Sequence, residues 1–128
     1  MLFSWNVFSQ GIQFEIGSWK EVLQKAKQEN KLIFVDLYTT WCGPCKKMAA
    51  ETFPQQVVGD YFNKNFVNYK IDAEKGEGPE LAGKYEVSAY PTLVFVNAAG
   101  ELVYKFMGVR TADKLIAEGE KAVRLYAL

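Results

Sequence analysis

The chain contains two cysteines, and they lie three positions apart in Trp41-Cys42-Gly43-Pro44-Cys45. A pair at this spacing closes a small ring, so its disulfide can form and reopen without linking distant parts of the fold. Proline is tolerated in the first turn of a helix, and we therefore expect the pair to lie at a helix start. The unpaired N–H groups and positive dipole end there stabilise a thiolate, the species that attacks disulfides. The pattern indicates thiol–disulfide chemistry.

Two other uses of the cysteines compete with this interpretation. A zinc site usually draws four ligands from Cys and His. The chain has no His and no third Cys, so a zinc site of that kind within one chain is excluded. A metal ion shared by the thiolates of two chains remains an alternative, and so do two inert thiols in the core. For the chain itself we expect no metal and no cofactor.

Asp36 is the second candidate for chemistry, because it lies six positions before Cys42 in an otherwise apolar run. A carboxyl group buried in a strand has its pKa raised by desolvation, since burial disfavours the charged form. Such a group could exchange a proton with a neighbouring thiol. The alternatives are a solvated carboxylate at the strand end and a hydrogen-bonded structural one.

The elements that must position these residues follow from apolar spacing and capping signals. Ser18 and Glu21 have the spacing of a capping box and predict a helix to about Asn30. The run 31–38 predicts a strand covered on both faces. Further helices are predicted from the cysteine pair to Pro54 and over 55–63, 79–85 and 111–125, and further strands over 66–71, 92–96 and 101–106. This order predicts an α/β fold whose central mixed sheet has an antiparallel hairpin at one side.

The bulk composition indicates one globular domain over residues 1–128, in which 1–17 supply an N-terminal extension and a first strand. Apolar residues make up 49% of the chain, which argues against disorder. Fifteen basic and fifteen acidic residues cancel, so the charge balance gives no indication of nucleic-acid binding. No apolar run reaches the roughly 18 residues of a membrane span. The first basic residue is Lys20, so we expect no signal peptide at the apolar start. Four aromatic residues are expected to pack the extension: Trp5, Phe8, Phe14 and Trp19.

The chain resembles the thioredoxin family over nearly its whole length. The family's redox segment is similar to Phe34–Leu37 followed by Trp41–Lys46. Its cis-proline loop is similar to Ser88–Thr92, and the glycine of its substrate groove is similar to Gly108. The resemblance implies the thioredoxin fold, with helices on both faces of the sheet. It also implies a protein thiol–disulfide oxidoreductase, acting as a disulfide reductase or exchange carrier. A disulfide isomerase with the same residues and a non-catalytic binding module of this fold are the alternatives.

The resemblance also implies a role for each candidate residue. Cys42 is expected to be the nucleophile, and Cys45 the more buried, resolving thiol of a redox-active Cys42–Cys45 disulfide. Asp36 is expected to exchange a proton with Cys45. With Pro91 in cis, the Tyr90 backbone would lie beside the disulfide and pair with an extended substrate strand. The expected substrate-binding residues are Trp41, Gly43, Pro44, Tyr90, Pro91, Thr92 and Gly108.

Three features depart from thioredoxin itself. Asn68 aligns with the lysine near the family's buried aspartate, Tyr90 replaces a small aliphatic residue, and the stretch 73–81 is longer. Without that lysine, the pKa of Asp36 is expected to rise further. These features resemble extracytoplasmic thioredoxin-like domains, which include the C-terminal domain of the transmembrane disulfide reductase and candidate disulfide isomerases.

The resemblance to that group implies a periplasmic or other extracytoplasmic location, with the cytoplasm as the alternative. The expected partners are disulfide-bonded or dithiol protein substrates and an upstream protein that donates or accepts electrons. We expect a monomer that serves cell redox homeostasis.

Overall fold

The structure, a computed structural model, describes residues 10–128, so two of the aromatic residues expected to pack the N-terminal extension, Trp5 and Phe8, lie outside the described residues. The elements follow the predicted order: α1 (Trp19–Glu29), β1 (Leu32–Tyr38), α2 (Gly43–Lys47), η1 (Met48–Thr52), α3 (Gln56–Asn65), β2 (Phe66–Asp72), α4 (Gly78–Lys84), β3 (Thr92–Val96), β4 (Leu102–Met107) and α5 (Ala112–Ala127). The π-helical turn η1, which the sequence did not predict, continues α2 as far as Thr52, just before Pro54. Between residues 10 and 128, no helix has both the length and the apolar character that crossing a bilayer requires.

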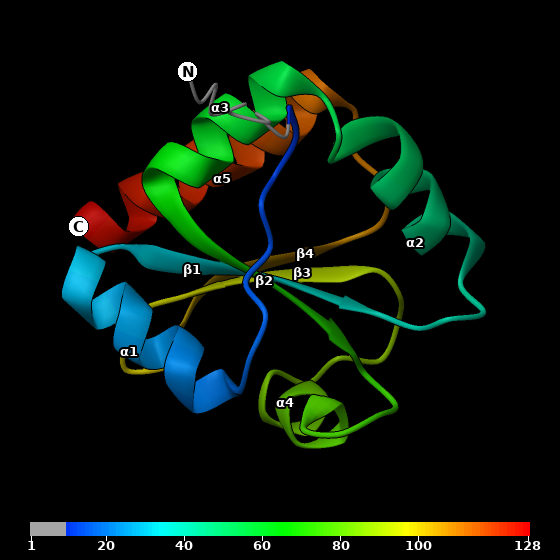
Figure 1. Cartoon of the computed structure of the whole chain (residues 1–128), viewed down its shortest axis with the longest axis horizontal. Coiled ribbons are helices and arrows are strands. Elements are labelled where there is room, and N and C mark those ends of the chain that lie inside the picture. The colour runs from blue at the N-terminus through cyan, green and yellow to red at the C-terminus, as the bar shows by residue number, and fades with distance from the viewer. Residues whose placement is uncertain (1–9) are drawn as a thin grey trace, which may run out of the picture.

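The four strands form one mixed sheet in the order β2-β1-β3-β4. Strands β1 and β2 run parallel, as their crossover through α2 and α3 requires. Strand β3 is antiparallel both to β1 and to β4, and the turn 97–100 joins β3 and β4 as predicted. Helices α1 and α4 cover one face of the sheet, while α3 and α5 cover the other (Figure 1). This is the α/β thioredoxin fold that the sequence predicted.

Strand β1 is buried on both faces and, apart from Asp36, its buried side chains are apolar. Its even-numbered side chains Leu32 and Phe34 pack with α3 and α5, and its odd-numbered ones pack with α1 and α4. The Phe34 ring lies 4.7 Å from that of Phe62 and 5.1 Å from that of Phe95, between ring centroids. A fully buried phenylalanine contributes roughly 1.5–3 kcal/mol relative to an exposed one. The central strand therefore fixes the position of whatever follows its C-terminal end.

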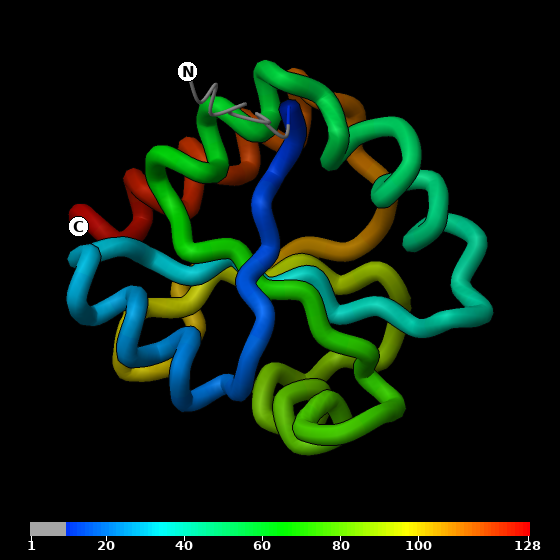
Figure 2. The backbone as a smooth tube through the Cα atoms, viewed as in Figure 1, coloured from blue at the N-terminus to red at the C-terminus, as the bar shows by residue number. Residues whose placement is uncertain are grey.

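Residues 10–17 run across the outer edge of β2 (Figure 2). The amide of Ile12 donates to the carbonyl oxygen of Phe53 at 2.9 Å, and that of Glu15 donates to Asn68 at 2.7 Å. In its described part, the expected first strand amounts to a single parallel bridge between Glu15 and Tyr69. The segment nevertheless packs Phe14 edge-on against Phe53, with 5.3 Å between ring centroids.

Candidate active site

Cys42 and Cys45 form a disulfide at the start of α2, directly beyond the end of β1. Cys42 is the N-cap residue, and its Sγ accepts a hydrogen bond from the Cys45 amide at 3.1 Å. Pro44 lies in the first turn, where its missing N–H leaves no intrahelical bond unmade. The helix start therefore places one N–H donor on the Cys42 sulfur, as a stabilised thiolate requires.

The two cysteines are almost equally buried, with 4% of Cys42 and 6% of Cys45 exposed. The expectation that Cys45 is the more buried residue is therefore wrong for the disulfide form. The physical reason is the ring itself, because each bonded sulfur covers the face that the other would present to solvent.

Asp36 lies in β1 with 1% of its surface exposed. Its Oδ2 is 3.7 Å from the ammonium of Lys70, while its Oδ1 has no hydrogen-bond partner among the described residues. Burial raises the pKa of Asp36 to about 6, and the positive charge of Lys70 opposes that rise. The predicted upward direction agrees with the structure.

The expectation that Asp36 lacks a neighbouring cation is wrong. In the parallel pairing of β1 with β2, Asp36 is opposite Lys70, and Asn68 is opposite Phe34. Asn68 instead donates from its buried amide to the carbonyl oxygen of Phe62 at 3.1 Å. Aligning sequence positions identified Asn68, whereas the strand register determines which side chain faces the carboxyl group. Sequence reasoning therefore missed Lys70.

The Lys70 ammonium is held among aromatic rings as well as by the carboxylate. It lies 5.4 Å from the ring centroid of Phe14, 5.2 Å from that of Tyr38 and 5.5 Å from that of Phe53. Contacts of this kind favour a cation over the ring face. A cavity of about 270 Å³ adjoins Lys70 and Cys45, and its other lining residues are Tyr38, Thr39, Thr40, Lys46 and Ala49. Cys45 and Lys70 thus line one opening to solvent.

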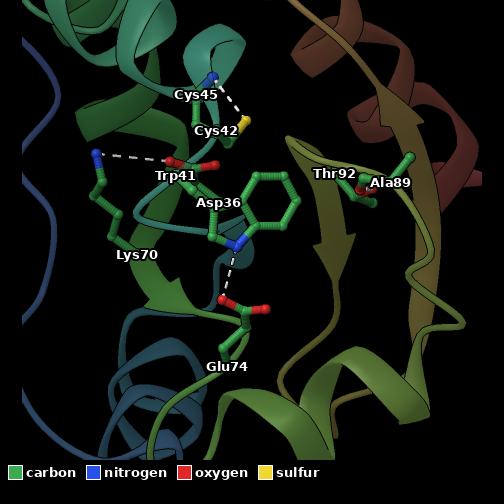
Figure 3. Close-up of a disulfide and its surroundings, with 8 residues drawn as sticks. All are labelled: Asp36, Trp41, Cys42, Cys45, Lys70, Glu74, Ala89 and Thr92. Atoms are coloured by element: carbon green, nitrogen blue, oxygen red, sulfur yellow. Dashed lines mark hydrogen bonds and ion pairs between the residues drawn. A yellow bond between two sulfur atoms is a disulfide. The ribbon is translucent and has the colours of Figure 1, made fainter.

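Trp41 and the segment before β3 lie together beside the disulfide (Figure 3). Trp41 is 65% exposed, and its ring meets that of Tyr90 edge-on with 6.0 Å between centroids. Its indole Nε1 donates to Glu74 Oε1 at 2.9 Å. Glu74 is a residue of this site that the sequence did not suggest, because it lies 33 positions from Trp41.

The structure gives each of the other predicted substrate-binding residues a place. Tyr90–Pro91 is a cis peptide bond, and the Pro91 carbonyl accepts from the Gly108 amide at 3.0 Å. Gly108 has φ +95°, a conformation that favours glycine. Thr92 is buried, and its hydroxyl donates to the carbonyl oxygen of Ala89. Thr92 therefore shapes the segment from within, while Gly43 and Pro44 are exposed beside the disulfide.

Among the residues that the structure describes, no three His, Cys, Asp or Glu side chains gather where they could hold a metal ion. The chemistry that the arrangement supports is carried by its own groups. The ring supplies two sulfurs at a helix start, the buried carboxyl supplies a group that titrates near neutral pH, and the exposed rings supply an apolar surface.

Comparison with known proteins gives a family and several relatives. The thioredoxin family model matches residues 12–121. A solution structure of a candidate disulphide-isomerase from Bacteroides thetaiotaomicron is 49% identical, with a TM-score of 0.80, over 91% of this chain and 97% of that one. The C-terminal domain of Neisseria meningitidis DsbD in its oxidised form is 27% identical, with a TM-score of 0.68, over 80% and 90% of the two chains.

A curated relative, the protein disulfide-isomerase of Datisca glomerata, is 31% identical over 88 residues, or 69% of this chain. The matched region spans only 17% of that relative's length. The likeness to the disulfide isomerase is therefore the likeness of one domain.

Proposed function

This chain belongs to the thioredoxin family of thiol–disulfide oxidoreductases, and from that membership we propose that its Cys42–Cys45 pair reduces or exchanges disulfides in protein substrates. The observation that carries the proposal is the disulfide itself, closed at a helix start beside a buried carboxyl group. A binding module without catalytic activity has no need of this combination.

In the reducing direction, the Cys42 thiolate attacks one sulfur of a substrate disulfide. A mixed disulfide forms, and the other substrate sulfur leaves as a thiolate that takes up a proton. Cys45 then gives its proton to the Asp36 carboxylate and attacks the Cys42 sulfur. The second substrate sulfur leaves as a thiolate as the Cys42–Cys45 disulfide closes, and it takes up the proton that Asp36 held. Two electrons have then passed to the substrate, with one proton from solvent and one from Cys45. An upstream dithiol protein restores the reduced pair.

The surroundings of each group support these roles. The Cys45 amide already donates to the Cys42 sulfur, and N–H donors at a helix start favour the thiolate. A general base works best with a pKa near the operating pH, and that of Asp36 is about 6. The cavity that Lys70 and Cys45 line gives solvent protons access to Cys45.

Substrate binding is assigned to the surface beside the ring. An extended substrate segment would pair with the Tyr90 backbone, in the manner of strand addition. Gly43, Pro44 and Gly108 leave room for its main chain, and Trp41 offers apolar contact area.

The likeness to the DsbD domain supports an extracytoplasmic location. Reduction is favoured over isomerisation, because Gly-Pro separates the cysteines and no His lies in the chain to stabilise the thiolate strongly. We therefore expect a redox potential of roughly −230 to −280 mV. A glutathione titration that gives a value above about −180 mV would indicate an isomerase or oxidase instead.

The decisive experiment compares the two single cysteine variants. Cys45→Ser, added in its reduced form to disulfide-bonded protein substrates, should retain attack by Cys42 and accumulate mixed disulfides that are visible on a non-reducing gel. Cys42→Ser should trap few. The wild-type protein should reduce insulin with dithiothreitol as donor, and the double variant provides the background rate. Equal trapping by both single variants, or insulin reduction no faster than the double variant, contradicts the proposal.

A further inference from the structure

The loop from Ala73 to Glu77, which joins β2 to α4, is fixed by its own hydrogen bonds. Asp72 Oδ1 accepts from the Glu74 amide at 2.9 Å, and the Gly78 amide donates to the Lys75 carbonyl at 2.9 Å. A Cβ on Gly78 would overlap the carbonyl oxygen of Asp72, so the close approach requires glycine there. The loop therefore presents its exposed side chains from a defined backbone.

Two glutamates tie this loop to elements on either side of it. Glu77 Oε2 accepts from the Trp19 amide, at the start of α1, at 2.9 Å. Glu74 Oε1 accepts from the Trp41 indole at 2.9 Å, directly before the nucleophilic position. Hydrogen bonds that involve a carboxylate are stronger than neutral ones. The loop is thus hydrogen-bonded both to the start of α1 and to Trp41 beside the Cys42–Cys45 disulfide.

Trp41 is held on two sides although most of its surface is exposed. Its N–H donates to Glu74 (Figure 3). Its ring lies edge-on to that of Tyr90, with an interplanar angle of 86°. An exposed tryptophan without such partners would sample several rotamers. Here the two rings lie next to each other beside the disulfide, on the surface where a substrate must approach.

We propose that Glu74 is a positioning residue for substrate docking, which holds the Trp41 indole against Tyr90 as a preformed wall beside the Cys42–Cys45 disulfide. The wall suits an extended peptide that carries an apolar side chain near its own cysteine. The inference rests on the proposed oxidoreductase function. Glu74 fixes the Trp41 ring before the peptide arrives. Binding of the peptide therefore does not lose the conformational entropy of that side chain. The effect falls on the affinity for peptides and not on the exchange between sulfurs.

The test compares three variants in two assays. Glu74→Ala removes the acceptor, whereas Glu74→Gln keeps a carbonyl oxygen at the same place and removes only the charge. Glu80→Ala is the matched control, since Glu80 is exposed in α4 and has no hydrogen bond or ion pair within residues 10–128. Insulin serves as the protein substrate, and dithiobis(nitrobenzoic acid) serves as a disulfide without a peptide chain. Glu74→Met replaces Glu74→Ala if that variant does not fold.

We expect Glu74→Ala to raise KM for insulin about threefold to tenfold with kcat unchanged, the effect of one unordered side chain. Its rate with the small disulfide should equal that of the wild type. Glu74→Gln and Glu80→Ala should stay within about twofold in both assays. With 5-fluorotryptophan in place of tryptophan, the Trp41 signal should shift and narrow in Glu74→Ala but not in Glu74→Gln.

Three results would overturn the positioning role. The first is an unchanged KM for insulin in Glu74→Ala. The second is a rise of that KM in Glu74→Gln as large as in Glu74→Ala. The third is a loss of rate in Glu74→Ala that is as large with the small disulfide as with insulin. A wild-type protein that reduces neither substrate would instead refute the oxidoreductase function, so the two failures are distinguishable.

Discussion

At the scale of single residues, the proposed chemistry involves a buried carboxyl group and one ammonium. Asp36 has an oxygen with no hydrogen-bond partner in the described part of the chain, and the charge of Lys70 lies 3.7 Å from the other oxygen. Burial raises the pKa of Asp36 more than the charge of Lys70 lowers it, because that pKa is about 6 and not the ordinary 3.8. A raised pKa in a folded acid has a defined consequence for stability.

Asp36→Asn should stabilise the fold above pH 6 and leave it unchanged near pH 4. Between these values, the unfolded chain ionises this carboxyl before the folded chain does, so wild-type stability falls as pH rises from about 4 to about 6. Asparagine does not titrate, and the gain should level off at about 3 kcal/mol above that window. Urea unfolding at pH 4, 5, 6 and 7.5 measures the difference. A gain that is independent of pH would show that the carboxyl is not the source.

Lys70→Met should raise the pKa of Asp36 further, because it removes the opposing charge and keeps an apolar side chain among the rings. The acid limb of the insulin-reduction profile should move to higher pH by the same amount. Lys75→Met, in the exposed loop after β2, is the control. If the pH profiles of Lys70→Met and Lys75→Met superimpose, the charge of Lys70 does not control the titration of Asp36.

At the scale of elements, the site depends on how closely α3 approaches the segment 10–17. A Cβ on Gly59 would overlap the backbone of Gln10 and Gly11, so the helix and the segment touch main chain to main chain. The same segment places the Phe14 ring over the Lys70 ammonium. The contact thus connects the packing of a helix to the surroundings of the buried carboxyl.

Gly59→Ala should destabilise the fold by about 1–3 kcal/mol, because the added methyl group must displace the segment or the helix. The control is Gly83→Ala in α4, where no atom lies within 4 Å of the new Cβ. That change should stabilise the fold by about 0.5–1 kcal/mol, since alanine is the better helix former. Chemical unfolding of both variants tests the contrast, and equal effects would contradict a close approach at Gly59.

The same contrast between local and distant contacts explains what the sequence could predict. Ser18 and Glu21 do form the capping box that starts α1, and the apolar runs ending at Tyr38 and Val96 are strands. These features depend on neighbours in the chain. The pairing of Lys70 with Asp36 and the bond from Trp41 to Glu74 depend on strand register and loop path, which no local pattern contains. The roles of the individual site residues stay predictions.

At the scale of the whole molecule, two apolar cores lie on the two faces of one sheet. Phe34 and Phe95 belong to the core under α3 and α5, and Val35 and Val94 belong to the core under α1 and α4. Strands β1 and β3 are the inner strands and pair on both sides. The free energy of opening should therefore be highest there.

Native-state hydrogen exchange should show the slowest amides in β1 and β3, near the global free energy of unfolding. Amides of β4 should exchange earlier, because β4 is an outer strand with exposed side chains at Leu102 and Met107. Two-dimensional NMR in deuterated buffer resolves the strands. If amides in α5 exchange more slowly than those in β1, the most stable region of the molecule lies outside the sheet.

The bond from the Glu15 amide to Asn68 has a consequence for behaviour in crowded solution. Unpaired strand edges are templates for chains of other molecules, and a sheet with two open edges can grow from both. Residues 10–17 shield the edge at β2, so within the described chain the edge at β4 is the one left for such growth. Glu15→Pro, which removes this donor, should therefore leave the β2 edge less shielded and the protein more prone to edge-to-edge association.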